Sequence, residues 1–138
     1  MEQIANEEML KNAMNDDEYD ELARPPNAEV PRDHELWPLI SAAIREIYDP
    51  EIPVNIYELG LIYKIDLSKG QQGQYDVFVE MTLTSPACPV AQEMPGWVQG
   101  AIFPIEGIGH VDVEIIWDPP WDPSMMAETA KLQLNMFT

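Results

Sequence analysis

The chain has 138 residues, of which 46% are hydrophobic, enough for one domain with its own core and too few for two ordinary ones. Its 25 acidic residues against 7 basic ones give a formal net charge of -18. This balance argues against nucleic acid as a partner, because phosphate binding needs clustered basic side chains, and it disfavours an anionic membrane surface for the same reason. An electropositive partner or a cation is compatible with it.

No apolar run reaches the roughly 20 residues that span a bilayer. The first eight residues lack the basic and apolar regions of a signal peptide. The single cysteine, Cys88, cannot form an internal disulfide, so nothing calls for an oxidising compartment. These features predict a cytoplasmic protein with a reduced thiol and no membrane segment.

Residues 1–32 form an acidic leader that ends in a proline-rich stretch over 24–31. Its acidic residues are Glu2, Glu7, Glu8, Asp16, Asp17, Glu18, Asp20, Glu21 and Glu29. Such a composition buries too little apolar surface to offset the cost of ordering, so we expect the leader to be mostly disordered and the folded domain to cover 33–138. A solvated leader is the expectation, and an arm that binds a partner is the alternative.

The first predicted helix covers 36–47. Its apolar residues recur at spacings of three and four, as expected for one face of an amphipathic helix: Leu36, Leu39, Ile40, Ala43, Ile44 and Ile47. Asp49-Pro50 ends the helix, because the residue before proline avoids helical dihedrals. After an extended connector, Asn55 and Glu58 have capping-box spacing for a single helical turn, which Gly60 closes.

Alternating apolar residues predict three strands, over 61–67, 75–83 and 111–117, each with one face inward. The polar, glycine-containing loop 68–74 suits an antiparallel hairpin. Residues 89–109 are long enough for a helix, which makes the second and third strands parallel through a right-handed crossover. Pro95-Gly96 lies inside that helix and is expected to kink or divide it.

A last helix over 124–134 follows Asp122-Pro123, which reads as a cap and first-position pair. The predicted order is therefore α-β-β-α-β-α. This order predicts a small two-layer domain of the α+β or α/β class, with a three-stranded mixed sheet and helices packed on it.

Cys88 lies at the junction between the second strand and the crossover helix. Pro89 suits the first position of a helix, which makes Cys88 the capping residue. The positive end of the helix dipole favours a thiolate there and lowers the thiol pKa from its free value of about 8.5. The alternative is that Cys88 is a small buried apolar residue.

The histidines of the chain are poorly placed to assist Cys88, either as zinc ligands or as a catalytic base. A closed zinc site needs four ligands, and Cys88, His34 and His110 have no usable spacing for one. His110, the candidate base of a thiol enzyme, falls at the other end of a parallel strand pair. We therefore predict no catalytic residue.

Four further side chains are candidates to line the site. The carboxylates of Asp49 and Glu51 could help to hold iron near a thiolate, although Asp49 also has a structural role as a helix stop. Trp117 and Trp121 are predicted to form a hydrophobic wall beside the cysteine.

Three segments of the chain resemble a known family. They are YDPEIPVNIYELGLIY over 48–63, MTLTSPACPVA over 81–91 and WDPPWDPSMM over 117–126. Together they resemble the metal-sulfur cluster biosynthetic domain family, in particular SufT-type accessory proteins of the SUF system of iron-sulfur cluster assembly. The resemblance covers 34–136. Ala87 stands where the family often has Gly or Asn.

The resemblance implies an accessory factor in iron-sulfur cluster assembly or transfer to client apoproteins, and not an enzyme. Cys88 corresponds to the motif cysteine and is expected to be a labile attachment point for iron or a cluster, held transiently. One thiolate cannot complete a cluster, which typically takes four ligands. A cluster would be shared with a second protomer, a partner or a small thiol. The implied partners are iron-sulfur assembly proteins and client apoproteins, and a homodimer is one of these arrangements. Asp49, Glu51 and Thr84 are the further site residues, with Thr84 as a hydrogen-bond donor to the sulfur.

Three alternatives stay open at this point. One is an accessory subunit for maturation of a metal-dependent oxygenase, within the same resemblance. Another is a metal-free protein-protein adaptor, in which Cys88 matters only through packing. The third is a thiol enzyme with Cys88 as nucleophile.

Overall fold

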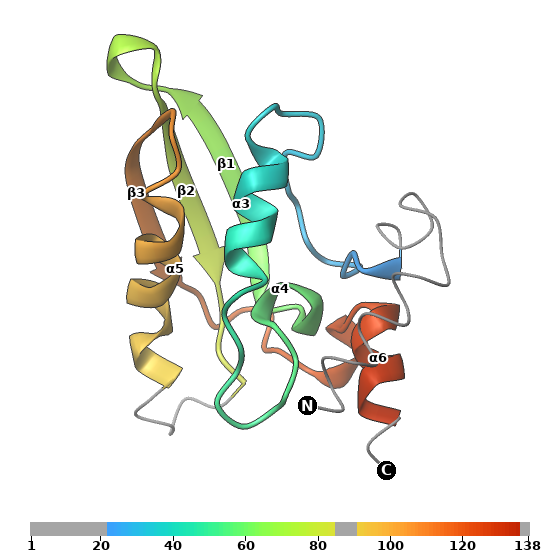
Figure 1. The fold of residues 1–138 in the computed structure, drawn as a ribbon. Coiled ribbons are helices and arrows are strands. Elements are labelled where there is room, and N and C mark those ends of the chain that lie inside the picture. Colours follow the sequence, from blue (N-terminus) through green and yellow to red (C-terminus); the bar gives the residue numbers. More distant parts are fainter. Residues whose placement is uncertain (1–21, 85–90, 136–138) are drawn as a thin grey trace.

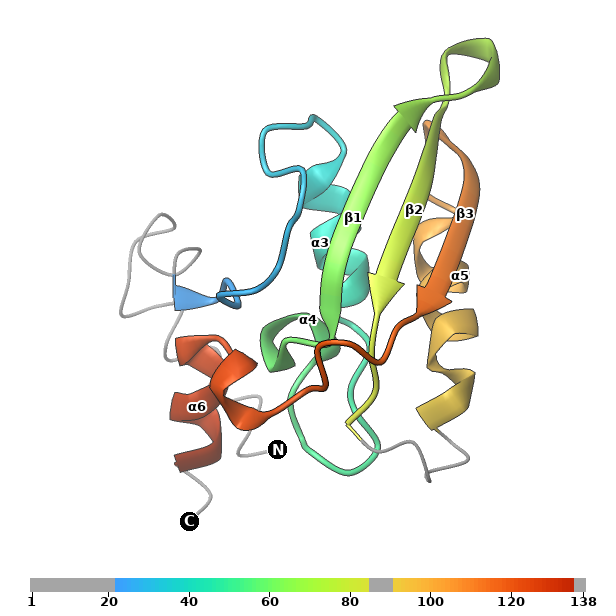
Figure 2. The ribbon, with the colours of Figure 1, turned by 180° about the vertical axis from the view of Figure 1, so that it is seen from behind.

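The computed structural model describes residues 22–84 and 91–135. In this part of the chain, helices α3 and α5 cover one face of a three-stranded sheet, while α4 and α6 lie beyond one end of it (Figure 1). The opposite view shows the sheet in front of both covering helices (Figure 2). The predicted two-layer fold with a mixed sheet is thus confirmed.

The sheet has the order β1-β2-β3. Strand β1 (Ile62–Lys69) runs antiparallel to β2 (Tyr75–Met81), and β3 (Ile108–Ile115) runs parallel to β2. The predicted hairpin and crossover are both confirmed. The side chains of Val77, Val79 and Met81 alternate along β2 toward the helices and are all buried, so the core lies between the sheet and its helical layer.

Helix α3 (Trp37–Ile44) is shorter than predicted, and most of its predicted face is confirmed: Ile40 and Ile44 are buried, and Leu36 and Ile47 pack against the core. It buries Trp37, Ile40, Ser41 and Ile44, whereas Leu39 is 53% exposed, so the predicted face was wrong at Leu39. The helix ends at Ile44 rather than at Asp49-Pro50. The reason is that the backbone N–H of Ile56 donates to the carbonyl of Ile47 at 2.9 Å, which holds 47–48 beside 55–56 in extended pairing.

Helix α5 (Met94–Ile102) follows a 3-10 turn, Ala91–Glu93, and has Glu93 at its N-cap. Pro95 falls in its first turn, where a proline is tolerated, and so it marks the start of the helix instead of a kink. The prediction that Cys88 caps a helix beginning at Pro89 concerns residues outside the described ones.

The end of the chain contains two helical pieces where one was predicted. The Asp122 cap is confirmed, because its Oδ1 accepts the backbone N–H of Ser124 at 2.7 Å. The turn it caps is a short 3-10 helix, Pro123–Met125, and α6 (Glu128–Asn135) begins only after Met126, which is extended. The third predicted strand also ends earlier, at Ile115, so Trp117 lies in a loop and is 49% exposed.

Part of the predicted leader, residues 22–32, belongs to the described structure. Glu29 pairs with the edge strand β1: its N–H donates to the Tyr63 carbonyl and its carbonyl accepts from Ile65, both at 2.9 Å. The domain boundary at residue 33 stays a prediction. No helix within 22–84 or 91–135 has the length and apolarity to cross a bilayer.

Candidate functional site

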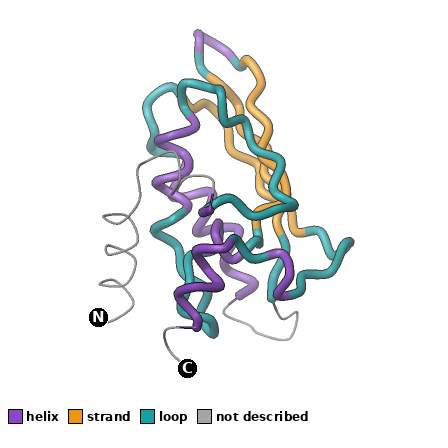
Figure 3. The backbone as a smooth tube through the Cα atoms, turned by 90° about the vertical axis from the view of Figure 1, so that its right-hand side faces the viewer, coloured by secondary structure: helices purple, strands orange, loops and turns teal. Residues whose placement is uncertain are grey.

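Three loops meet at the end of the sheet where β2 and β3 finish. They are residues 47–55, 82–84 and 116–127, which contain or adjoin the three motif segments (Figures 1 and 2). Seen from the side, the helices lie to one side of the strands and beyond their lower end, except for the short 3-10 turn Gln71–Gly73 in the hairpin at the top (Figure 3). The parallel pairing of β2 and β3 is what brings the loop after each strand to the same end.

Asp49 joins the first of these loops to the end of β2. Its Oδ2 accepts the hydroxyl of Thr84 at 3.1 Å, and its Oδ1 accepts the backbone N–H groups of Glu51 at 2.8 Å and Ile52 at 3.0 Å. Asp49 is only 5% exposed. Both carboxylate oxygens are therefore occupied in holding the loop, and Asp49 organises this turn instead of ending a helix.

Asp49 and Thr84, which were predicted as separate site residues, are thus brought together. Thr84 is the last described residue before the segment that carries Cys88. The hydroxyl hydrogen of Thr84 is directed at Asp49. Glu51 joins the turn through its backbone only, and its side chain is exposed. The predicted donation from Thr84 to the sulfur of Cys88 stays a prediction, since Cys88 lies outside the described residues.

The two tryptophans of the third loop have different environments. Trp121 packs against the hydrophobic core, and its indole N–H donates to the carbonyl of Leu59 at 2.8 Å. Trp117 is largely solvent-exposed. Trp121 therefore fastens the loop to α4, and a shared wall made by both rings beside the cysteine stays a prediction.

Tyr63 holds the same loop to β1. Its hydroxyl donates to the carbonyl of Pro119 at 2.7 Å and lies 3.4 Å from the sulfur of Met125. Burial raises the pKa of Tyr63, and the nearby carboxylates of Asp122 and Asp118 act in the same direction. Tyr63 thus stays a neutral donor, which the bond to Pro119 requires.

Beneath the loops lies α4 (Ile56–Leu59), a single turn whose four residues are all buried. Asn55 Oδ1 accepts the N–H of Glu58 at 2.9 Å, which confirms the predicted N-cap, and Gly60 ends the turn with a φ of 91° as predicted. The Glu58 carboxylate pairs with the Asn55 side chain, whose Nδ2 donates to it at 3.0 Å, and not with the backbone N–H as in the usual capping box.

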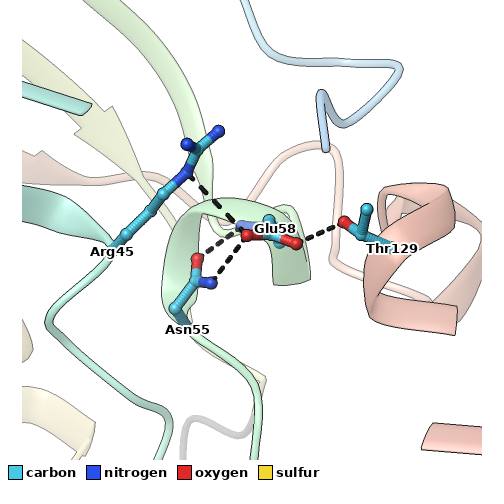
Figure 4. Close-up of polar contacts among 4 residues, drawn as sticks. All are labelled: Arg45, Asn55, Glu58 and Thr129. Atoms are coloured by element: carbon cyan, nitrogen blue, oxygen red, sulfur yellow. Dashed lines mark hydrogen bonds and ion pairs between the residues drawn. The ribbon is translucent and has the colours of Figure 1, made fainter. Parts of the chain in front are cut away.

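Glu58 also connects α4 with two other helices (Figure 4). Its Oε2 lies 3.8 Å from Nε of Arg45, just after α3, and its Oε1 accepts the hydroxyl of Thr129 in α6. The side chain is fully buried. Sequence reasoning missed this role, although a carboxylate inside the apolar stretch Ile56 to Ile62 was a usable signal.

No metal site is apparent within the described residues, since no group of three or more His, Cys, Asp or Glu there could hold an ion. His110 lies near the start of β3, where its N–H donates to Asp76 at 3.0 Å. It is therefore at the opposite end of the sheet from Thr84, as the parallel pairing predicts.

A sequence profile described as "Iron-sulfur cluster assembly protein" matches residues 39–115. The chain belongs to this family. The iron-sulfur cluster assembly match includes the Asp49 turn, Thr84 and Cys88, and it ends just before the third motif segment, 117–126. The resemblance to iron-sulfur assembly proteins is therefore confirmed.

Two curated relatives are similar to about two thirds of this chain. An "Fe-S protein maturation auxiliary factor" of Porphyromonas gingivalis is 43% identical over 67% of this chain and 84% of its own length. The "Fe-S protein maturation auxiliary factor SufT" of Staphylococcus aureus is 36% identical over 65% of this chain and 98% of its own length. A domain of unknown function from Bacillus anthracis has a similar structure, with a TM-score of 0.59 and 28% identity over 70% of this chain and 89% of that one.

Replacing Asp49 by alanine should lower the free energy of unfolding by about 3 kcal/mol, because three hydrogen bonds to a charged acceptor are lost together. Asp49→Asn, which keeps one acceptor oxygen, should lose about 1 kcal/mol. Urea unfolding followed by circular dichroism measures both. The matched control is Asp112→Ala, an exposed carboxylate on β3, which should stay within about 0.5 kcal/mol of native. Equal stability of the Asp49→Ala and Asp112→Ala variants would contradict the assigned role.

Proposed function

We propose that this protein is an accessory factor that acts in the cytoplasm in the assembly of iron-sulfur clusters or their transfer to client apoproteins. The observation that carries the proposal is the match to the family over 39–115, supported by relatives named as iron-sulfur protein maturation factors. Its partners in this role are iron-sulfur assembly proteins and the clients themselves. The activity is one of delivery or docking and not of catalysis.

Within this proposal, Cys88 supplies the labile thiolate that holds iron or a cluster as cargo. The segment that carries it follows β2, and the bond between Thr84 and Asp49 fixes the point from which that segment starts. The remaining ligands of a cluster must come from a second protomer, a partner or a small thiol, because one thiolate is too few. A homodimer is one of the three arrangements that would supply these ligands.

Anaerobic reconstitution with iron and sulfide tests the role of Cys88. The native protein should take up iron, and Cys88→Ser should take up at least about tenfold less, because a serine hydroxyl is a poor ligand for iron at neutral pH. Ser85→Ala, a change in the same segment that leaves the thiol in place, is the matched control. Bound iron is measured by a colorimetric chelator after gel filtration. Light scattering of the same fractions reports whether loading produces a dimer.

Other outcomes would redirect the proposal. Equal iron uptake by the native protein and Cys88→Ser would remove Cys88 from the mechanism. Normal client maturation with Cys88→Ala would favour a metal-free adaptor. Hydrolase or transferase activity that disappears on alkylation of Cys88 would favour a thiol enzyme.

A further inference from the structure

Strand β3 borders the sheet, and its outer edge is open in the described part of the chain. It pairs with β2 on one side, and no described strand lies beyond it on the other (Figures 1 and 2). The backbone N–H of Ile116 donates to the carbonyl of Met81 at 2.8 Å. Because the backbone groups of successive residues in a strand point to opposite sides, the even-numbered residues of β3 face β2 and the odd-numbered ones face outward. An unpaired edge of this kind is a template for pairing with another chain.

One outward-facing group of this edge is already bonded to a side chain. Nε2 of Gln99, in α5, donates to the carbonyl of Val111 at 2.9 Å, which agrees with the outward direction of the odd-numbered residues. Further along β3, the N–H groups of Val113 and Ile115 also face outward, and no described residue accepts them. The open part of the edge is therefore the end of the strand, residues 113–115.

The side chains of β3 divide this edge into an apolar side and an acidic side. Val113 and Ile115 pack against the core beneath the helical layer. Asp112 and Glu114 are exposed on the sheet face that the helices leave uncovered, and the register places Glu80 of β2 beside Glu114. Opposite charges in cross-strand pairs are stabilising and like charges are destabilising. An added strand that alternates apolar and basic residues would match both sides.

A second copy of this chain suits the edge poorly. Antiparallel pairing of β3 with itself, centred on Val113, would place Asp112 of each copy opposite Glu114 of the other. Two chains that each carry a net charge of -18 would also repel each other as they approach. The charges along the edge therefore favour a basic partner over self-association.

We propose that the open edge of β3 binds an extended, basic segment of a partner protein by strand addition. Backbone carbonyls of the segment accept the N–H groups of Val113 and Ile115, and its lysine or arginine side chains face Asp112 and Glu114. This inference goes beyond the proposed function and does not depend on Cys88. Failure of strand addition would therefore leave the iron-uptake result unchanged, and the reverse also holds.

Isothermal titration of the full chain with a capped peptide that alternates lysine and valine tests the proposal. The peptide should bind, and Asp112→Asn combined with Glu114→Gln should weaken binding about tenfold, because two cross-strand charge pairs are lost. Glu35→Gln combined with Glu46→Gln is the matched control. It removes the same charge from exposed positions outside the sheet and should change the affinity less than about twofold. A peptide that alternates glutamate and valine should not bind.

Amide hydrogen exchange of the unaltered protein, followed by NMR, reports whether the backbone of β3 takes part. When the lysine-valine peptide saturates the chain, the N–H groups of Val113 and Ile115 should exchange at least about tenfold more slowly. Those of Asp112 and Glu114 already face β2 and should change less.

Three results would overturn the proposal. If both double variants weaken binding equally, only overall charge matters. If the peptide does not bind at millimolar concentration, or binds without slowing exchange at Val113 and Ile115, the edge is not its site. If those two amides become protected as the concentration of the free chain rises, a second copy occupies the edge instead.

Discussion

Replacing Glu58 by alanine is expected to lower the free energy of unfolding by about 3 to 5 kcal/mol, the usual cost of removing one partner from a buried charged pair. The change removes the carboxylate that faces Arg45 and accepts from Asn55 and Thr129. The side chains of Asn55 and Thr129 would then be buried without their acceptor, and the partly exposed Arg45 would lose its ion-pair partner. The missing carboxylate would also leave a cavity beside the α4 backbone. Equilibrium unfolding in guanidinium chloride measures the loss.

Two further variants separate the charge of Glu58 from its position. Glu114→Ala removes an exposed carboxylate from β3 and should change stability by no more than about 0.5 kcal/mol. Glu58→Gln keeps an acceptor oxygen and the side-chain volume while removing the charge, so its loss should fall between the two. A Glu58→Ala variant within about 1 kcal/mol of native would show that the connection between the three helices contributes little.

Gly60→Ala is the second change with a large expected effect, about 2 to 4 kcal/mol of lost stability. Gly60 has a φ of 91°, in the left-handed region that residues with a Cβ rarely adopt. An added Cβ would also lie 2.9 Å from the carbonyl carbon and 3.3 Å from the Cβ of Met125. Backbone strain and a clash with the loop 116–127 therefore add together.

Gly100→Ala is the matched control for this substitution. Gly100 lies within α5 and an added Cβ there meets nothing within 4 Å. Because alanine is a better helix former, this variant should be neutral or more stable by up to about 1 kcal/mol. Thermal unfolding compares the two, and a similar melting temperature for both would contradict the close packing of Gly60 against Met125.

Features decided by neighbours in the chain could be predicted from the sequence. The hairpin, the parallel crossover, the Asn55 cap and the turn at Gly60 each depend on local spacing or on the conformational range of one residue. The two errors in α3 have a different origin. Whether Leu39 is buried and where the helix stops depend on the sheet and on the pairing of Ile47 with Ile56, which local periodicity does not report.

The residues of the candidate site could likewise be selected from the sequence, but the contacts between them could not. Asp49 and Thr84 were selected as separate motif residues, but their hydrogen bond joins positions 35 apart, and only the folded chain reveals it. The partnership of Glu58 with Thr129 spans 71 positions. The sequence shows that these residues are present, but the contacts between them form only because the fold brings distant segments side by side.

The single turn α4 also defines how much of the chain must fold as one unit. The last carbonyl groups of a helix have no partner within the helix. In α4, the carbonyl of Glu58 accepts the backbone N–H of Ala127 and the carbonyl of Leu59 accepts the indole N–H of Trp121, each at 2.8 Å. The match to the family profile ends at residue 115, before either donor. A fragment that ends at residue 115 would leave both carbonyl groups without these donors, so we expect it to be less stable than a fragment that extends through α6.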